Sequence, residues 1–137
     1  MTLKQMVVVY FVALAVFLLV DMVWLSLIAR GFYKKYLGAL LGSRVRWAAA
    51  ILFYLVYILG LIVFVIRPAI IRGEPIEALF YGALFGLISY ATYDLSNLAT
   101  IREWPLVVTV VDLVWGTALG GIVSLASAVV GRWLVTH

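Results

Sequence analysis

The sequence predicts an all-α protein, a bundle of four transmembrane helices with a short amphipathic interfacial segment after the first. Two observations predict this class. The chain has 137 residues, of which 67% are hydrophobic and 12% charged, and its mean hydropathy is +1.21. A soluble domain of this length cannot cover so much apolar surface, because small domains leave much of their surface exposed. The apolar residues also fall into four runs, each long enough to cross about 30 Å of hydrocarbon as a helix.

These runs are residues 5–29, 47–66, 76–100 and 105–130. We expect helices, because backbone groups in lipid must be satisfied internally and the runs lack the alternation of barrel strands. The first run is too long for a secretory signal, and no small-residue cleavage site follows it, so we expect a retained helix. Arg67 and Pro68 are expected to end the second helix, and Pro105 to begin the fourth. Residues 1–137 then form a single membrane domain.

The connection after the first helix, "RGFYKKYLGALLGSRVR" at 30–46, has an amphipathic pattern. Lys34 and Lys35 fall on one side of a helical projection. The other side carries Phe32, Tyr33, Tyr36, Leu37, Leu40 and Leu41. This pattern favours a short helix lying in the headgroup plane, with a solvated basic loop as the alternative.

Positive charges predict the orientation of the chain. The first and third loops hold six of them: Arg30, Lys34, Lys35, Arg44, Arg46 and Arg102. The termini and the second loop hold four: Lys4, Arg67, Arg72 and Arg132. Because positive loops stay in the cytoplasm, we expect a multi-pass membrane protein with the first and third loops in the cytoplasm and both termini outside. Membrane lipid is the expected partner, and nucleic acid is not, because no soluble basic face exists to bind it. Trp47, Trp104 and Trp133 are expected to anchor helix ends at the interface.

Three of the six acidic residues, Asp21, Asp94 and Asp112, lie inside predicted membrane helices. An unpaired ionised carboxylate in hydrocarbon costs several kcal/mol, so these side chains are expected to face the bundle interior. Their distances along the chain from the first and third loops are similar. At 1.5 Å per residue, each carboxylate lies roughly 12–14 Å from the same side of the membrane. The strings "DMVW" and "DLVW" place Asp21 and Asp112 each three residues before a tryptophan.

Small and polar residues form a stripe on each of the last two helices. The fourth helix carries Thr109, Asp112, Gly116, Gly120, Ser124, Ser127 and Gly131. The third carries Gly82, Gly86, Tyr90, Asp94 and Asn97. Small residues let backbones approach closely, so these stripes are expected to be packing faces. The expected result is a polar pocket in the cytoplasmic half of the bundle. Its candidate binding residues are Asp21, Tyr54, Tyr90, Tyr93, Asp94, Asn97 and Asp112, with Trp24 and Trp115 as walls.

The residue types limit the chemistry of such a pocket. The chain has no cysteine, and its one histidine is His137, so neither a zinc site nor a histidine relay is expected in the membrane. No cofactor is expected. Carboxylates with amide and hydroxyl neighbours suit a proton, a hard cation or a small cationic solute. If a metal binds, Asp21, Asp94 and Asp112 are its candidate ligands.

Three interpretations stay open. In the first, the cluster binds a proton or cation, with or without transport, and at least one carboxyl group holds or shares a proton. In the second, the chain is a membrane-embedded lipid-acting enzyme or an accessory subunit, with the carboxyl groups as general acid and base. In the third, the polar groups only join helices, at about 0.6 kcal/mol for each hydrogen bond. Transport through four helices would need a homo-oligomer, and Ser127 with Gly131 is a candidate outer contact.

Three strings resemble a known family: "TYDLSNLATIREWP" at 92–105, "VDLVWG" at 111–116 and "VDMVWL" at 20–25. It is a family of small bacterial membrane proteins, catalogued as domain-of-unknown-function family 2177, and the resemblance covers nearly the whole chain. The resemblance implies a four-helix inner-membrane protein and adds weight to Asp21, Asp94, Asn97 and Asp112. It implies no activity and does not choose among the three interpretations.

Overall fold

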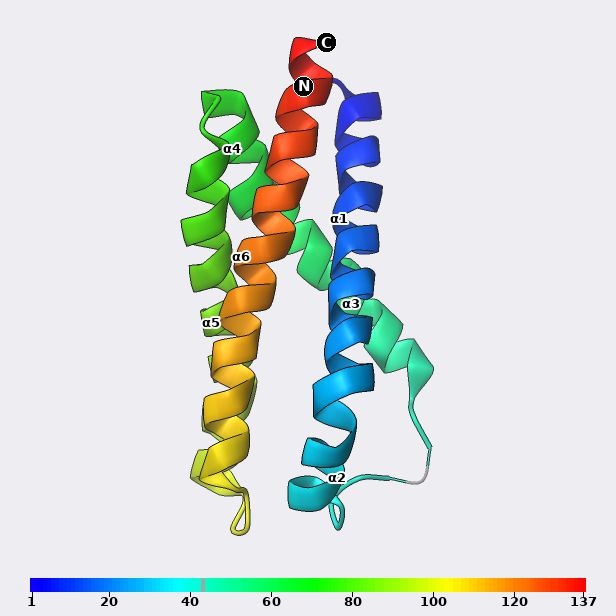
Figure 1. Ribbon diagram of the computed structural model, residues 1–137, viewed down its shortest axis with the longest axis vertical. Coiled ribbons are helices and arrows are strands. Elements are labelled where there is room, and N and C mark those ends of the chain that lie inside the picture. Colours follow the sequence, from blue (N-terminus) through cyan, green and yellow to red (C-terminus); the bar gives the residue numbers. More distant parts are fainter. Residues whose placement is uncertain (43) are drawn as a thin grey trace.

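The computed structural model describes residues 1–42 and 44–137. In Figure 1 the helices run up and down as a bundle, with both chain ends at one end of the molecule. Four helices are long and apolar enough to cross a membrane, and the described residues contain no strand, so the predicted class is confirmed. The four are Leu3–Leu37, Trp47–Arg72, Pro75–Thr100 and Leu106–Thr136.

The first helix consists of α1 (Leu3–Trp24), a π-helical segment η1 (Leu25–Ala29) and α2 (Arg30–Leu37), which follow one another without a break. Thr2 begins it with a capping box, in which its hydroxyl accepts from the Gln5 backbone N–H and the Gln5 side chain accepts from the Thr2 N–H.

The predicted amphipathic segment is helical: α2 continues the first helix and packs on the end of the bundle. Its Leu37 is buried with Trp104 and Val108, which belong to the last loop and the fourth helix. Burying this apolar side against other side chains removes it from water. Lys34 and Lys35, on the other side, remain exposed.

The second helix consists of α3 (Trp47–Leu61), a π-helical segment η2 (Ile62–Ile66) and α4 (Arg67–Arg72). The predicted end at Arg67 and Pro68 is wrong, because the helix continues to Gly73, whose φ of 72° terminates it. Proline lacks an N–H and its ring crowds the carbonyl four residues earlier. The π-helical turn directly before Pro68 adjusts the backbone at this point, as membrane helices commonly do around proline.

The third and fourth helices, α5 (Pro75–Thr100) and α6 (Leu106–Thr136), pack against each other along a seam of glycines. A Cβ atom added at Gly86 would collide with the carbonyl oxygen of Gly116. One added at Gly120 would collide with the carbonyl oxygen of Gly82. The two backbones therefore touch, and the predicted small-residue stripes are the packing faces of α5 and α6.

The predicted outer contact of Ser127 and Gly131 is wrong, because both residues pack inside the bundle. Ser127 and Gly131 are buried, and Gly131 faces Ile70 and Val9, so they form no outer contact. Trp104 is only 8% exposed, and its indole N–H donates to the Thr109 hydroxyl at 3.0 Å. The fourth helix is also longer than predicted and ends at Thr136 instead of near residue 130.

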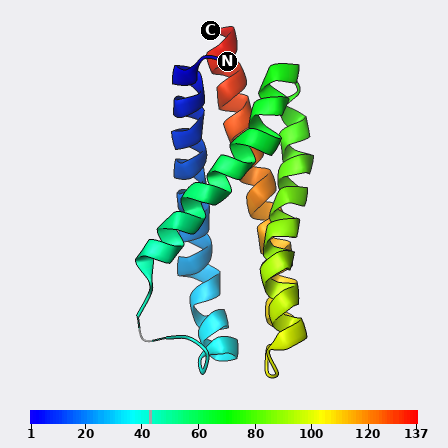
Figure 2. The same cartoon turned by 180° about the vertical axis from the view of Figure 1, so that it is seen from behind.

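The second helix crosses the bundle diagonally (Figure 2). Its η2 segment packs on α5 and α6, whereas α3 packs mainly on α1 and moves away from α5 toward its own first residues. The half of α5 that ends at Thr100 is therefore not covered by α3. The polar residues of the chain gather in this half.

Candidate functional site

The two most buried acids of the chain, Asp94 of α5 and Asp112 of α6, lie side by side. Their exposed fractions are 0% and 6%, and their carboxyl groups lie near each other. Neither carboxylate oxygen of Asp94 has a hydrogen-bond partner among the residues that the structure describes. A buried carboxyl group in this position can be satisfied by a proton or by a cation.

Asp112 is held from outside its own helix by a residue that the sequence did not suggest. Tyr33 of α2 donates its hydroxyl hydrogen to the Asp112 carboxylate. In an unbroken α-helix Tyr33 would lie about 120° around the axis from Asp21. The π-helical segment η1 turns the chain less per residue, which brings Tyr33 back toward the face of Asp21. The aromatic pattern of residues 30–46 was the available signal, but the pattern does not reveal a π-helical segment.

The third acid inside the bundle, Asp21 of α1, is held by a tryptophan of α6. The indole N–H of Trp115 donates to the Asp21 carboxylate at 3.3 Å. The Trp115 ring also stacks on Trp24, with 4.4 Å between ring centroids and 7° between ring planes. The two similar strings of the sequence therefore meet in the structure, because the tryptophan of "DLVW" contacts both the aspartate and the tryptophan of "DMVW".

Beside Asp21 lies a cavity of about 260 Å³, which we call the aromatic cavity. It is lined by Asp21, Trp24, Leu25, Tyr33, Ala50, Phe53, Tyr54, Tyr90 and Trp115, which come from all four membrane helices. Five of the predicted residues are among them: Asp21, Tyr54, Tyr90, Trp24 and Trp115. Asp21 supplies the one ionisable carboxyl group of this lining, and no lysine or arginine lines it.

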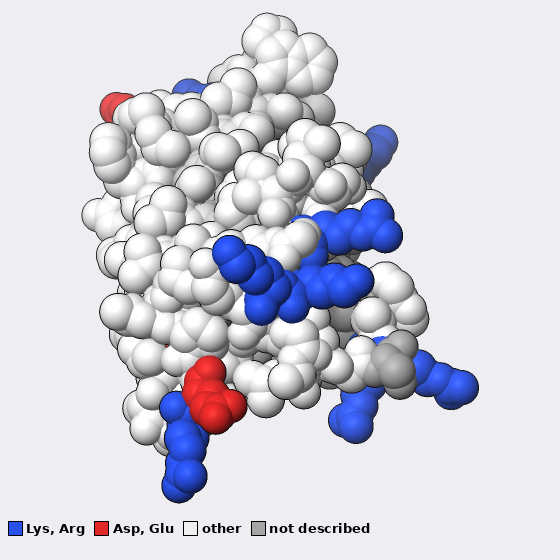
Figure 3. Space-filling model, turned by 60° about the horizontal axis from the view of Figure 1, so that its bottom comes forward, with Lys and Arg blue, Asp and Glu red and all other residues white. Residues whose placement is uncertain are grey.

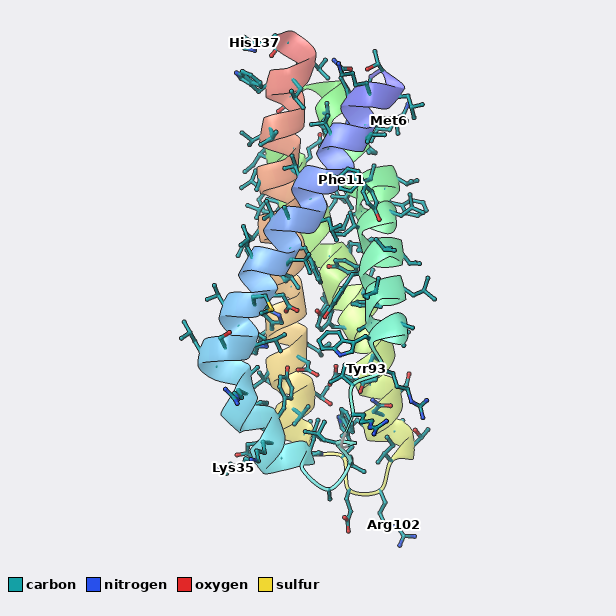
Figure 4. The ribbon with its side chains drawn as sticks, turned by 90° about the vertical axis from the view of Figure 1, so that its right-hand side faces the viewer. Met6, Phe11, Lys35, Tyr93, Arg102 and His137 are labelled. Atoms are coloured by element: carbon teal, nitrogen blue, oxygen red, sulfur yellow. The ribbon has the colours of Figure 1, made fainter. Side chains whose placement is uncertain are left out.

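The remaining predicted residues lie around this cavity and not in its wall. Asp94 and Asp112 are joined to it through Tyr33, whose ring lines the cavity while its hydroxyl contacts Asp112. Tyr93 is 59% exposed and Asn97, one turn further along α5, is half-buried. In Figure 4, Tyr93 lies in the half of the molecule nearer Lys35 and Arg102, opposite the end with Met6 and His137.

The three aspartates do not form one metal site. Among the described residues no group of three histidine, cysteine or acidic side chains could hold a metal ion. Asp94 and Asp112 face each other, whereas Asp21 is turned to the indole of Trp115. The shared ligand set that the sequence allowed is therefore corrected to a carboxyl pair and a separate carboxylate.

In a comparison with protein-family models, residues 6–129 match the family described as "Predicted membrane protein (DUF2177)". The match spans most of the chain, so the chain belongs to this family. Searches of curated proteins and of solved structures each found no match. The family description places the chain in a membrane and assigns no activity.

Proposed function

We propose that the chain binds a small organic cation in the aromatic cavity, with Asp21 as its counter-ion. The observation that carries this proposal is the lining: one carboxylate surrounded by the rings of Trp24, Trp115, Tyr33, Tyr54, Phe53 and Tyr90. Aromatic faces attract ammonium groups, and the attraction grows when the site is shielded from water. Asp21 takes part in no ion pair found among the described residues, so its charge is available to a ligand.

A hard metal ion fits this geometry less well than an organic cation. Calcium takes six or more oxygen ligands, and magnesium demands a regular octahedron of them. Around the aromatic cavity, oxygen ligands are few and the wall is formed mainly by rings. An organic ammonium group needs one negative charge and apolar faces, which is what the cavity provides.

The Asp94–Asp112 pair supplies the second half of the proposal, a proton site. Asp94 is 0% exposed and neither of its carboxylate oxygens has a hydrogen-bond partner among the described residues, so its ionised form is costly and a proton resides on it. Tyr33 links this pair to the cavity because it lines one and donates to the other. A cation in the cavity places a positive charge one side chain away from the carboxyl pair, which favours the ionised carboxylate and therefore the loss of a proton. Cation binding and protonation are then coupled, which is the requirement for exchange of a cation against a proton across a membrane.

The cavity lies in the half of the bundle that we propose faces the cytoplasm of a bacterial cell. Lys and Arg side chains gather on the end that carries the first and third loops (Figure 3). Because the chain has no cysteine, single cysteines report orientation cleanly. A membrane-impermeant maleimide added to intact cells should label Thr136→Cys and leave Glu103→Cys unlabelled. The reverse labelling would contradict this orientation.

The binding proposal is tested with tetraethylammonium and purified protein in lipid nanodiscs, measured by titration calorimetry. Removing the counter-ion in Asp21→Asn should weaken binding by more than about tenfold, since truncating one partner of a buried charge pair costs several kcal/mol. Glu103→Gln removes an exposed acid outside the cavity and serves as the matched control. Equal affinity of Asp21→Asn and wild type would overturn the proposal.

A further inference from the structure

A second cavity lies directly beside the aromatic cavity. Its volume is about 330 Å³, and it is lined by Phe53, Ser89, Tyr90 and Tyr93. We call it the side cavity. Phe53 and Tyr90 line both cavities, so the two spaces meet at these rings. A ligand in the aromatic cavity therefore has an adjoining space into which a further part of it can extend.

The side cavity is apolar in character. No ionisable acid or base lines it apart from the two phenols. The hydroxyl of Ser89 donates to the Phe85 carbonyl of its own helix at 2.8 Å, so it offers its hydrogen to no ligand. A space with such walls suits hydrocarbon, because a polar ligand group placed there would lose its hydrogen bonds to water without replacement.

The side cavity opens toward the lipid. It lies between α3 and α5, where α3 diverges from the bundle (Figure 2). Phe53 and Tyr93, on its two sides, are both exposed on membrane-spanning helices. In a bilayer, residues exposed on such helices away from their ends face acyl chains, so the mouth of this cavity faces the hydrocarbon.

We propose that the bound cation is an amphiphile with an ammonium head and a single alkyl chain, which enters from the membrane. This inference rests on the proposed function. The head occupies the aromatic cavity beside Asp21, and the chain leaves through the side cavity past Phe53, Tyr90 and Ser89. A water-soluble cation without a chain fills the first space and leaves the second to lipid.

The test compares tetramethylammonium with decyltrimethylammonium, both titrated into nanodiscs of one lipid composition. Ser89→Phe fills the side cavity, and Ser96→Phe is the matched control. Ser96 lies seven residues further along α5, is exposed, and also bonds a carbonyl of its own helix. Because all proteins are compared in the same lipid, partitioning of the long chain cancels.

Ser89→Phe should weaken decyltrimethylammonium binding by about tenfold or more, because the inserted ring competes with the chain for the same volume. Tetramethylammonium binding should change less than about twofold in both variants. Equal loss in Ser89→Phe and Ser96→Phe, or no loss in either, would overturn the inference while the proposed cation site stands. If wild type binds neither probe, the proposed function itself fails.

A second measurement keeps the inference testable if Ser89→Phe does not fold. Decyltrimethylammonium with a diazirine at the end of its chain is photolysed in wild-type protein, and the labelled peptide is identified by mass spectrometry. We expect labels on α5 near Ser89 and Tyr93 or on α3 near Phe53. Labels confined to the outer faces of α1 or α6 would place the chain elsewhere and contradict the inference.

Discussion

Tyr33 and Asp112, which are 79 residues apart in the chain, share a hydrogen bond in which the phenol donates to the carboxylate. This bond connects α2, at the end of the bundle with the first and third loops, to the buried carboxyl pair of α5 and α6. It also puts one side chain in contact with both parts of the site.

Replacing Tyr33 by phenylalanine removes a donor to the Asp112 carboxylate. We expect Tyr33→Phe to lower the free energy of unfolding by about 1–3 kcal/mol, because the carboxyl group is left buried with an unmet hydrogen-bonding need. Tyr36→Phe is the control, since Tyr36 lies on the same short helix, is 38% exposed and has no hydrogen-bond partner among the described side chains. Thermal unfolding in a mild detergent measures the difference. Equal unfolding of the two variants would show that the bond contributes nothing to stability.

Substitution of Gly86 tests whether α5 and α6 pack through close contact of their backbones. A Cβ atom at Gly86 meets the backbone carbonyl oxygen of Gly116, which cannot move aside as a side chain can. We expect Gly86→Ala to cost more than about 2 kcal/mol and to weaken cation binding, because α5 also carries Tyr90 of the aromatic cavity. Gly31→Ala is the control, since nothing lies within 4 Å of a Cβ atom at Gly31. If the unfolding curves of the two alanine variants coincide, the close backbone contact of α5 and α6 at Gly86 is contradicted.

Composition and stripe patterns were sufficient to predict the membrane class, the four spans and the packing faces of the last two helices. All three follow from composition and simple periodicity, because lipid demands helices and small residues mark close backbone approach. The glycines of α5 and α6 meet as their spacing predicts. The inward position of Asp94 and Asp112 follows from the same argument, because an acid on the lipid face would be too costly.

Two of the features that sequence reasoning missed depend on the two π-helical segments. The η1 segment rotates Tyr33 toward the face of Asp21, and η2 lets the second helix run through Pro68. A π-helical turn depends on the tertiary packing around it, and the local pattern of residues carries no clear sign of it. The contact of α2 with Trp104 and Val108 was also not predicted, since an amphipathic side fits either headgroups or the end of a bundle.

Tyr57 gives a prediction of the opposite sign to that for Tyr33. Its side chain is buried, and its hydroxyl has no hydrogen-bond partner in the described structure. Tyr57→Phe should therefore leave stability unchanged or raise it by up to about 1 kcal/mol. The same substitution at Tyr10, whose hydroxyl donates to the Leu55 carbonyl at 3.0 Å, should lower stability by about 0.5–1.5 kcal/mol. A clear loss of stability in Tyr57→Phe, measured by thermal unfolding, would mean that the hydroxyl has a partner, such as a buried water molecule.

Asp94→Asn tests the coupling of cation and proton. If the Asp94–Asp112 pair releases its proton when a cation binds, the two ligands compete, and cation affinity should fall as the pH falls. The amide that this substitution introduces keeps the shape of the carboxyl group but cannot exchange a proton with Asp112. We therefore expect wild-type protein to release protons into weakly buffered solution when tetraethylammonium is added, as reported by a pH-sensitive dye. Asp94→Asn should release fewer protons than wild type, and the pH dependence of affinity that remains should be that of the counter-ion Asp21 alone. Wild-type binding that is independent of pH, with no proton release, would leave a cation site without coupling and would remove the argument for exchange.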